Sequence, residues 1–275
     1  MSDKELSWRF IEERVGEDPD IERARKASLE HGVDPITASA GEYIATIATA
    51  LNATSIIEVG TGLGVGTLWL AQACPDAHIT SIDSELDHHV SVREILTEAE
   101  IPTAKVRLIT EKALDVLPKM NEGSYDLVVI DADFQNVQAY VDHGLALVKP
   151  RGSVIVLGVL GDDLVADPAK RDDKTPAYRW LLKALDDRDD VVHTVNLIGD
   201  GLVHIVRLPE GKRYFPRAPA SWSWSSWASA SLTDTTSRPP PSRGTFTMMR
   251  RPSLTASMGP SPVLGFIAAM TGISS

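Results

Sequence analysis

The chain contains little cysteine and no long apolar run, and both shortages narrow the possible classes of protein. Cys74 is the single cysteine among 275 residues, so no disulfide can form within the chain. Its place in an apolar helical stretch favours packing over a role as a nucleophile. No apolar run reaches the roughly 18 residues of a membrane span, and the first residues lack the apolar centre of a signal peptide. We therefore expect a cytoplasmic protein that does not bind a membrane.

Acidic residues outnumber basic residues before residue 212. The formal net charge is −11, yet residues 212–275 contain seven lysines and arginines and only one acidic residue. The preceding part of the chain is therefore more acidic than the total indicates. A surface of this sign repels phosphate backbones, which disfavours nucleic acid as a partner and is compatible with a small-molecule substrate.

Glycine, in contrast, is concentrated directly after a predicted buried strand. Residues 58–66 read Glu-Val-Gly-Thr-Gly-Leu-Gly-Val-Gly and follow the apolar residues 55–57. Glycine accepts positive φ and leaves backbone N–H groups uncovered. A helix is predicted from residue 64 to 73, and its positive N-terminus adds to these donors. The segment therefore predicts a turn that binds a negatively charged or carboxylate-bearing ligand.

The spacing of these glycines excludes two common nucleotide-binding loops. A dinucleotide-binding dehydrogenase needs Gly-x-Gly-x-x-Gly, and the third position of that pattern holds Val65, Thr67 or Trp69 here. No Gly-Lys-Ser/Thr follows, so a Walker phosphate loop is excluded too. A glycine-rich turn that binds nothing stays open as an alternative.

A second acidic residue ends another predicted strand. Asp83 follows the apolar run from residue 77 to 82, and it lies 25 residues after Glu58. In nucleotide-binding sheets the acid at this strand end accepts hydrogen bonds from ribose hydroxyls. Asp83 is therefore the candidate ribose ligand. It could also cap the helix that begins near Glu85, and the two roles are compatible.

Strands and helices alternate through the middle of the chain. This alternation predicts a parallel sheet covered by helices on both faces. The last two strands are separated only by residues 198–201, too few for a helical crossover, so they should form an antiparallel hairpin. We expect an N-terminal helical segment over 1–35, an α/β domain over 36–211, and a low-complexity, disordered tail without assigned function over 212–275. The predicted strands are 55–59, 78–82, 105–109, 125–130, 153–157, 191–197 and 202–207, and the predicted helices between and around them are 64–73, 86–99, 112–119, 135–147 and 175–187.

The acid-x-Gly-x-Gly-x-Gly pattern resembles the first motif of S-adenosylmethionine-dependent methyltransferases. Residues 36–208 as a whole resemble the catechol/caffeoyl-CoA type of O-methyltransferase, often called family 3. The resemblance is carried by Thr37-Ala-Ser-Ala-Gly41, Glu58 to Gly66, Ile82-Asp83, Ala113-Leu-Asp-Val-Leu-Pro118, Tyr125 to Asp133 and Leu147 to Gly152.

The resemblance implies a Rossmann-like class I methyltransferase fold with a mostly parallel seven-stranded sheet and a C-terminal antiparallel hairpin. It also implies S-adenosylmethionine as cofactor, a small-molecule acceptor and a homodimer formed through the N-terminal helices. In the family, the segment at Thr37 closes over the methionine end of the cofactor, the acid at Glu58 holds its ammonium group, and the segment at Ala113 borders the adenine. The implied cofactor-binding residues are Thr37, Glu58, Gly60, Thr61, Gly62, Gly66, Asp83, Ala113 and Asp131.

The chain departs from the family where metal-dependent members hold a divalent cation. Those members combine an acid at the position of Asp131 with an Asp-Asn pair, and this chain has Leu157 and Gly158 at the positions of the pair. Neither side chain can ligate Mg²⁺. The lysine that often serves as base is replaced by Phe134. We therefore expect no metal, with Asp131 contacting the methionine ammonium or acting as the base; capping of the next helix is its alternative role.

Two further features stay open. The acidic run 161–173 is expected to face solvent, although it could select a cationic acceptor. His88, His89, His193 and His204 are expected to be surface or packing residues. The predicted activity is O-methyl transfer, with a catalytically inactive cofactor-binding protein as the alternative and an NAD-dependent oxidoreductase disfavoured by the glycine spacing.

Overall fold

The computed structural model describes residues 3–170 and 172–213. Its first elements are two helices, α1 (Asp3–Arg14) and α2 (Pro19–Glu30). Asp18 caps α2 by accepting a hydrogen bond from the Asp20 N–H, and Pro19 occupies the first turn, where no donor is needed. The predictions made for residues 214–275 lie outside the described part. Among the described residues, no helix is long and apolar enough to cross a membrane.

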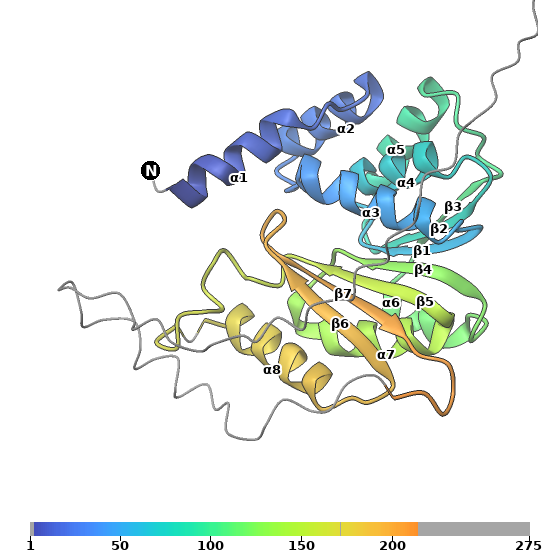
Figure 1. The fold of residues 1–275 in the computed structure, drawn as a ribbon. Helices are drawn as coiled ribbons and strands as arrows, with labels where there is room; N and C mark the ends of the chain where they lie inside the picture. The colour runs from blue at the N-terminus through green and yellow to red at the C-terminus, as the bar shows by residue number, and fades with distance from the viewer. Residues whose placement is uncertain (1–2, 171, 214–275) are drawn as a thin grey trace, which may run out of the picture. The chain divides into compact units, whose positions relative to one another are not determined.

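The centre of the fold is a seven-stranded sheet with the order β3-β2-β1-β4-β5-β7-β6 (Figure 1). The first five strands in this order run parallel, and β7 runs antiparallel to both of its neighbours. This arrangement confirms the predicted mostly parallel sheet with a C-terminal antiparallel hairpin. The strands are β1 (Ser55–Val59), β2 (His78–Asp83), β3 (Val106–Thr110), β4 (Tyr125–Ile130), β5 (Val148–Leu157), β6 (Val191–Asn196) and β7 (Leu202–Arg207).

Helices cover both faces of the sheet (Figure 1). One face packs against α3 (Ala38–Ala50), α4 (Val65–Ala73) and α5 (Leu86–Glu98), and α2 packs on α4 and α5. The opposite face packs against α6 (Ala113–Val116), α7 (Val137–Leu147) and α8 (Lys174–Asp186). Two 3₁₀ turns, η1 (Leu117–Lys119) and η2 (Phe134–Asn136), lie directly before or after these helices.

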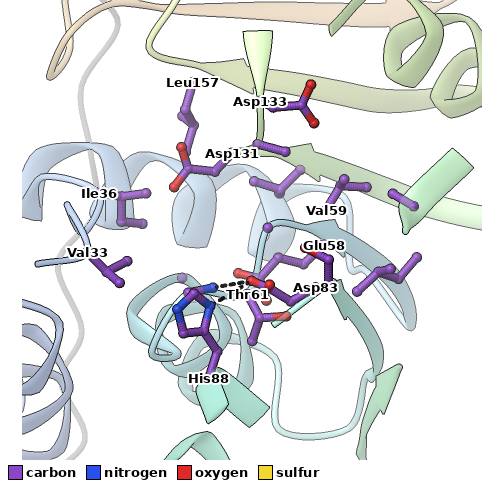
Figure 2. Close-up of a pocket in the computed structure, with 18 of the residues that line it drawn as sticks. Val33, Ile36, Glu58, Val59, Thr61, Asp83, His88, Asp131, Asp133 and Leu157 are labelled. Carbon is purple, nitrogen blue, oxygen red and sulfur yellow. Dashed lines mark hydrogen bonds and ion pairs between the residues drawn. The ribbon is translucent and has the colours of Figure 1, made fainter. Parts of the chain in front are cut away.

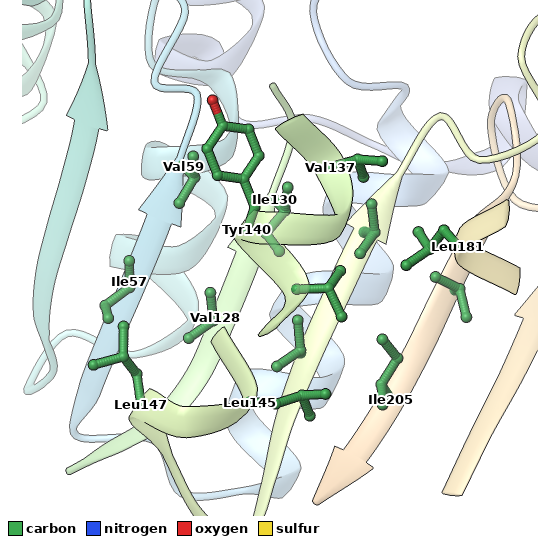
Figure 3. Close-up of a cluster of buried hydrophobic side chains, with 14 of the residues drawn as sticks. Ile57, Val59, Val128, Ile130, Val137, Tyr140, Leu145, Leu147, Leu181 and Ile205 are labelled. Carbon is green, nitrogen blue, oxygen red and sulfur yellow. The ribbon is translucent and has the colours of Figure 1, made fainter. Parts of the chain in front are cut away.

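Successive strand residues feed two separate cores, because side chains alternate between the faces of a sheet. In β1, Ile56 packs with the helices of the first face and Ile57 with those of the second. Figure 3 shows the second core, where Ile57 and Val128 of the sheet lie next to Leu145 and Leu147 of α7. Burial on both faces explains why these strands read as continuous apolar runs.

The structure differs from the predicted elements by more than one residue at three places. Strand β5 begins at Val148 rather than 153, because Val148 pairs with Tyr125 before the register shifts. The helix predicted over 135–147 begins with η2, because the Asp133 side chain accepts a hydrogen bond from the Asn136 N–H. The helix predicted over 112–119 is one turn of α6 followed by η1, which contains Pro118.

Candidate functional site

A cavity of about 530 Å³ opens at the carboxyl ends of β1, β2 and β4 (Figure 2). Ligands of open α/β sheets bind at this edge. Thr37 alone among the sequence-predicted site residues does not line it; this side chain caps α3 and lies beside Gly199 of the hairpin. The predicted residues that do line the cavity are Glu58, Gly60, Thr61, Gly62, Gly66, Asp83, Ala113 and Asp131.

Two glycines of the turn lie where a Cβ would collide with neighbouring atoms. Gly60 has a φ of 92°, and a Cβ there would lie 1.8 Å from the carbonyl oxygen of Asp131. A Cβ on Gly66 would lie 2.4 Å from Oε1 of Glu58. The absence of side chains at these positions lets the ends of β1 and β4 approach each other and lets the Glu58 carboxyl reach the start of α4.

Glu58 is a buried carboxyl group with two hydroxyl donors. The side chain is 2% exposed, and its Oε2 accepts hydrogen bonds from Thr67 and, at 2.6 Å, from Ser81. Burial raises the pKa of Glu58 to about 7, and the nearby charges of Asp131 and Asp83 raise it further against the effect of the two hydroxyls. Glu58 therefore titrates close to neutral pH in the cofactor-free protein.

Behind Glu58 lies a chain of buried polar side chains that the sequence did not reveal. Ser81 also bonds Thr61 at 2.6 Å, Thr61 bonds His89 Nε2 at 3.1 Å, and His89 Nδ1 bonds Thr110 at 2.7 Å. Burial lowers the pKa of His89, which favours the neutral ring. The polar chain thus ties β1, β2, β3 and α5 together beneath the glycine turn.

Asp83 fixes the turn from the neighbouring strand. Its Oδ2 accepts a hydrogen bond from the Gly62 N–H at 2.9 Å, and its Oδ1 accepts one from the Glu85 N–H at 2.9 Å. His88, expected at the surface or in packing, lines the cavity and places Nδ1 3.4 Å from Oδ2 of Asp83. Each carboxylate oxygen retains a second lone pair for a ligand.

The two acids after β4 have different surroundings. The Asp131 side chain is exposed to the cavity. The protein atoms that surround the cavity partly desolvate its carboxyl group, and this raises the pKa of Asp131 to about 6. Asp133 caps η2 and accepts a hydrogen bond from the Tyr140 hydroxyl at 2.5 Å. The residue that caps the helical turn after β4 is therefore Asp133 and not Asp131. The Asp131 carboxyl makes no hydrogen bond to the other described residues.

Two polar side chains, Tyr178 and Asp200, lie near Gly158, which directly follows the end of β5. Gly158 has a φ of 68°, and apart from its chain neighbours the described residues would place just two atoms within 4 Å of a Cβ there, Tyr178 Oη at 3.8 Å and Asp200 Oδ2 at 3.9 Å. Tyr178 is 6% exposed, and no described residue hydrogen-bonds to its hydroxyl. Burial and the charges of Asp131 and Asp200 raise its pKa to about 12, so the hydroxyl keeps its proton. No local sequence pattern marks this tyrosine.

The donor set at this edge does not fit a divalent cation. Leu157 and Gly158 stand at the positions where the resemblance implies oxygen ligands in metal-dependent members. Among residues 3–170 and 172–213, no three His, Cys, Asp or Glu side chains are grouped so that they could hold a metal ion. The expectation of metal independence stays a prediction.

The strand order, the reversed last strand and the glycine-turn cavity define the class I methyltransferase fold. The family model for O-methyltransferases matches residues 12–208. A protein of Mycobacterium ulcerans, named as a suspected O-methyltransferase, is 32% identical over 204 residues, which cover 74% of this chain and 91% of the relative. The chain belongs to the O-methyltransferase family, and it is an S-adenosylmethionine-dependent methyltransferase.

Solved structures agree with this assignment. The O-methyltransferase TomG of Streptomyces achromogenes, involved in tomaymycin synthesis and solved in complex with SAM, is 28% identical, with a TM-score of 0.66 over 76% of this chain and all of that one. A protein of Corynebacterium glutamicum at 22% identity shows the same fold, with a TM-score of 0.71 over 77% of this chain and all of that one. These comparisons confirm the fold and the reaction class predicted from the sequence.

Proposed function

We propose that the cavity binds S-adenosylmethionine and that the chain transfers the methyl group to a hydroxyl oxygen of a small molecule. The observation that carries this proposal is the Glu58 carboxyl, which is buried at the base of a glycine turn and lines a cavity of about 530 Å³. A carboxyl group that titrates near pH 7 can ionise when a cation arrives. The methionine ammonium group is such a cation.

The remaining cavity residues suit the rest of the cofactor. Asp83 would accept hydrogen bonds from the ribose hydroxyls with the lone pairs that Gly62 and Glu85 leave free. Ala113 lines the cavity at the start of α6, where a small apolar side chain leaves room for the flat face of the adenine. Glu58, Asp83 and Ala113 would thus contact the ammonium group, the ribose and the adenine of S-adenosylmethionine.

When bound, S-adenosylmethionine supplies a methyl group that is already activated by the sulfonium. The protein then has to align the acceptor oxygen and provide for its proton. Asp131 would lie beside the methionine end, and its pKa of about 6 leaves it largely ionised at neutral pH. The protonated Tyr178 hydroxyl would orient a polar group of the acceptor over Gly158.

We further infer that methyl transfer needs no metal, because Leu157 and Gly158 have no side-chain oxygen that could ligate a cation. A homodimer would cover the apolar side chains that α1 exposes, Leu6, Phe10 and Ile11 among them. We also propose a cytoplasmic location, where the single cysteine would stay reduced.

The test is methyl transfer from radiolabelled S-adenosylmethionine to a panel of phenols, catechols and hydroxy acids, with EDTA present. Asp131→Asn separates the two roles of this acid. If Asp131→Asn binds S-adenosylmethionine more weakly but turns over at the same rate at saturation, Asp131 contacts the methionine ammonium group. A turnover at least about tenfold lower with normal affinity would assign it to proton removal.

Asp142→Asn is the matched control, because this exposed carboxylate on α7 lies away from the cavity and pairs with Arg188. Cofactor binding without transfer to any acceptor would contradict the proposed activity and support an inactive binding protein.

A further inference from the structure

Residues 33–36 close one side of the cavity without belonging to a helix or a strand. A Cβ on Gly62 would lie 3.5 Å from Val33, and one on Gly66 would lie 3.7 Å from Ile36. Figure 2 shows both apolar side chains directed at the cavity from this segment. A molecule bound on the glycine turn would therefore contact residues 33–36.

This segment has few hydrogen bonds of its own. The Val33 N–H donates to the carbonyl oxygen of Ser28 at 2.9 Å. Residues 34–36 make a single hydrogen bond to the rest of the described chain, and Arg25 donates it: Nη1 lies 2.6 Å from the carbonyl oxygen of Ile36. A connection with so few bonds would open readily if that one were lost.

Arg25 is itself held rigidly. Its Nε and Nη2 each lie 2.6 Å from an oxygen of Glu17, in a bidentate pair whose side chains are 22% and 8% exposed. Glu17 also accepts a hydrogen bond from Trp69 Nε1 at 3.2 Å. Trp69 in turn packs directly against Gly41, where a Cβ would lie 2.2 Å from Nε1 of the ring. The bidentate pair with Glu17 therefore orients the planar guanidinium so that Nη1 points at the carbonyl oxygen of Ile36.

We propose that Arg25 is a positioning residue that holds residues 33–36 against the bound cofactor and slows its release. The inference rests on the proposed function of the cavity. Arg25 does not line the cavity, so it acts only through the backbone of Ile36. The hydrogen bonds that join Arg25 of α2, Glu17 of the α1–α2 connection and Trp69 of α4 thus control the residence time of the cofactor.

The test compares Arg25→Met with Arg23→Met in the full chain. Arg23 lies on the same helix and pairs with Asp20 and Glu98 at the surface, so its loss controls for a missing charge on α2. Because Arg25→Met leaves Glu17 buried without its partner, the double variant Glu17→Gln/Arg25→Met is measured too. The probes are the dissociation rate of S-adenosylhomocysteine and the hydrogen exchange of residues 33–36 without ligand.

We expect both Arg25 variants to release S-adenosylhomocysteine about tenfold faster or more, and their amides over 33–36 to exchange faster, while Arg23→Met matches the wild type. Release and exchange rates within twofold of the wild type in the folded double variant would overturn the inference. If the wild type does not bind S-adenosylhomocysteine, the proposed function fails. The exchange measurement then decides separately whether Arg25 holds the segment.

Discussion

Replacing Glu58 with glutamine should stabilise the cofactor-free protein at alkaline pH. The carboxyl group is buried, and its pKa in the folded protein is about 7 instead of 4.5. The folded state therefore binds the proton more tightly than the unfolded state, so the wild type loses stability as the pH rises through this range. At about 1.4 kcal/mol for each pH unit, the loss is about 3 kcal/mol at pH 8. Glutamine has the same shape and cannot ionise.

The assay is urea unfolding of both proteins at pH 5 and pH 8, without cofactor. The stability of Glu58→Gln relative to the wild type should rise by about 2 kcal/mol between these two pH values. Asp131 is present in both proteins, so its own titration largely cancels in this comparison. A relative stability that does not change with pH would refute the reasoning. The same variant should bind S-adenosylmethionine at least about a hundredfold more weakly, since the ammonium loses its anion.

Three further outcomes follow from the site. Because Glu58 must ionise to pair with the ammonium, the affinity for S-adenosylmethionine in calorimetry should be about tenfold higher at pH 8 than at pH 6, and a flat profile would contradict this role. Gly60→Ala should lower the free energy of unfolding by more than about 2 kcal/mol, since its Cβ would lie 1.8 Å from a carbonyl oxygen at a φ of 92°; Gly16→Ala, with open space around it, is the control. EDTA should leave the cofactor affinity unchanged, whereas a loss that Mg²⁺ restores would show that a cation takes part.

The strand ends and their acids could be predicted because their signals are local. The two isoleucines 56 and 57, then Glu58 and four glycines, define a strand and a turn within the twelve residues 55–66. The short connection 198–201 likewise forces an antiparallel hairpin. The structure places most of the predicted site residues around one cavity for this reason.

The missed residues owe their positions to long-range contacts. His89 is a polar residue on a helix in sequence, and only the meeting of β1, β2 and β3 gives it Thr61 and Thr110 as partners. Arg25 lies on the amphipathic helix α2 and Tyr178 on the amphipathic helix α8. The partners of these two side chains depend on how each helix packs against the rest of the fold. Thr37 fits the family pattern, but here its hydroxyl caps α3 instead of lining the cavity. Its cofactor contact stays a prediction.

The central claim is that this cavity is the S-adenosylmethionine site, and calorimetric titration of the full chain tests it most directly. S-adenosylmethionine should bind with one site per chain in EDTA, and NAD should give no saturable heat. Asp83→Asn should weaken the binding, because the amide offers the ribose one acceptor oxygen in place of two. No binding of S-adenosylmethionine to the folded wild type, or a preference for NAD, would contradict the account.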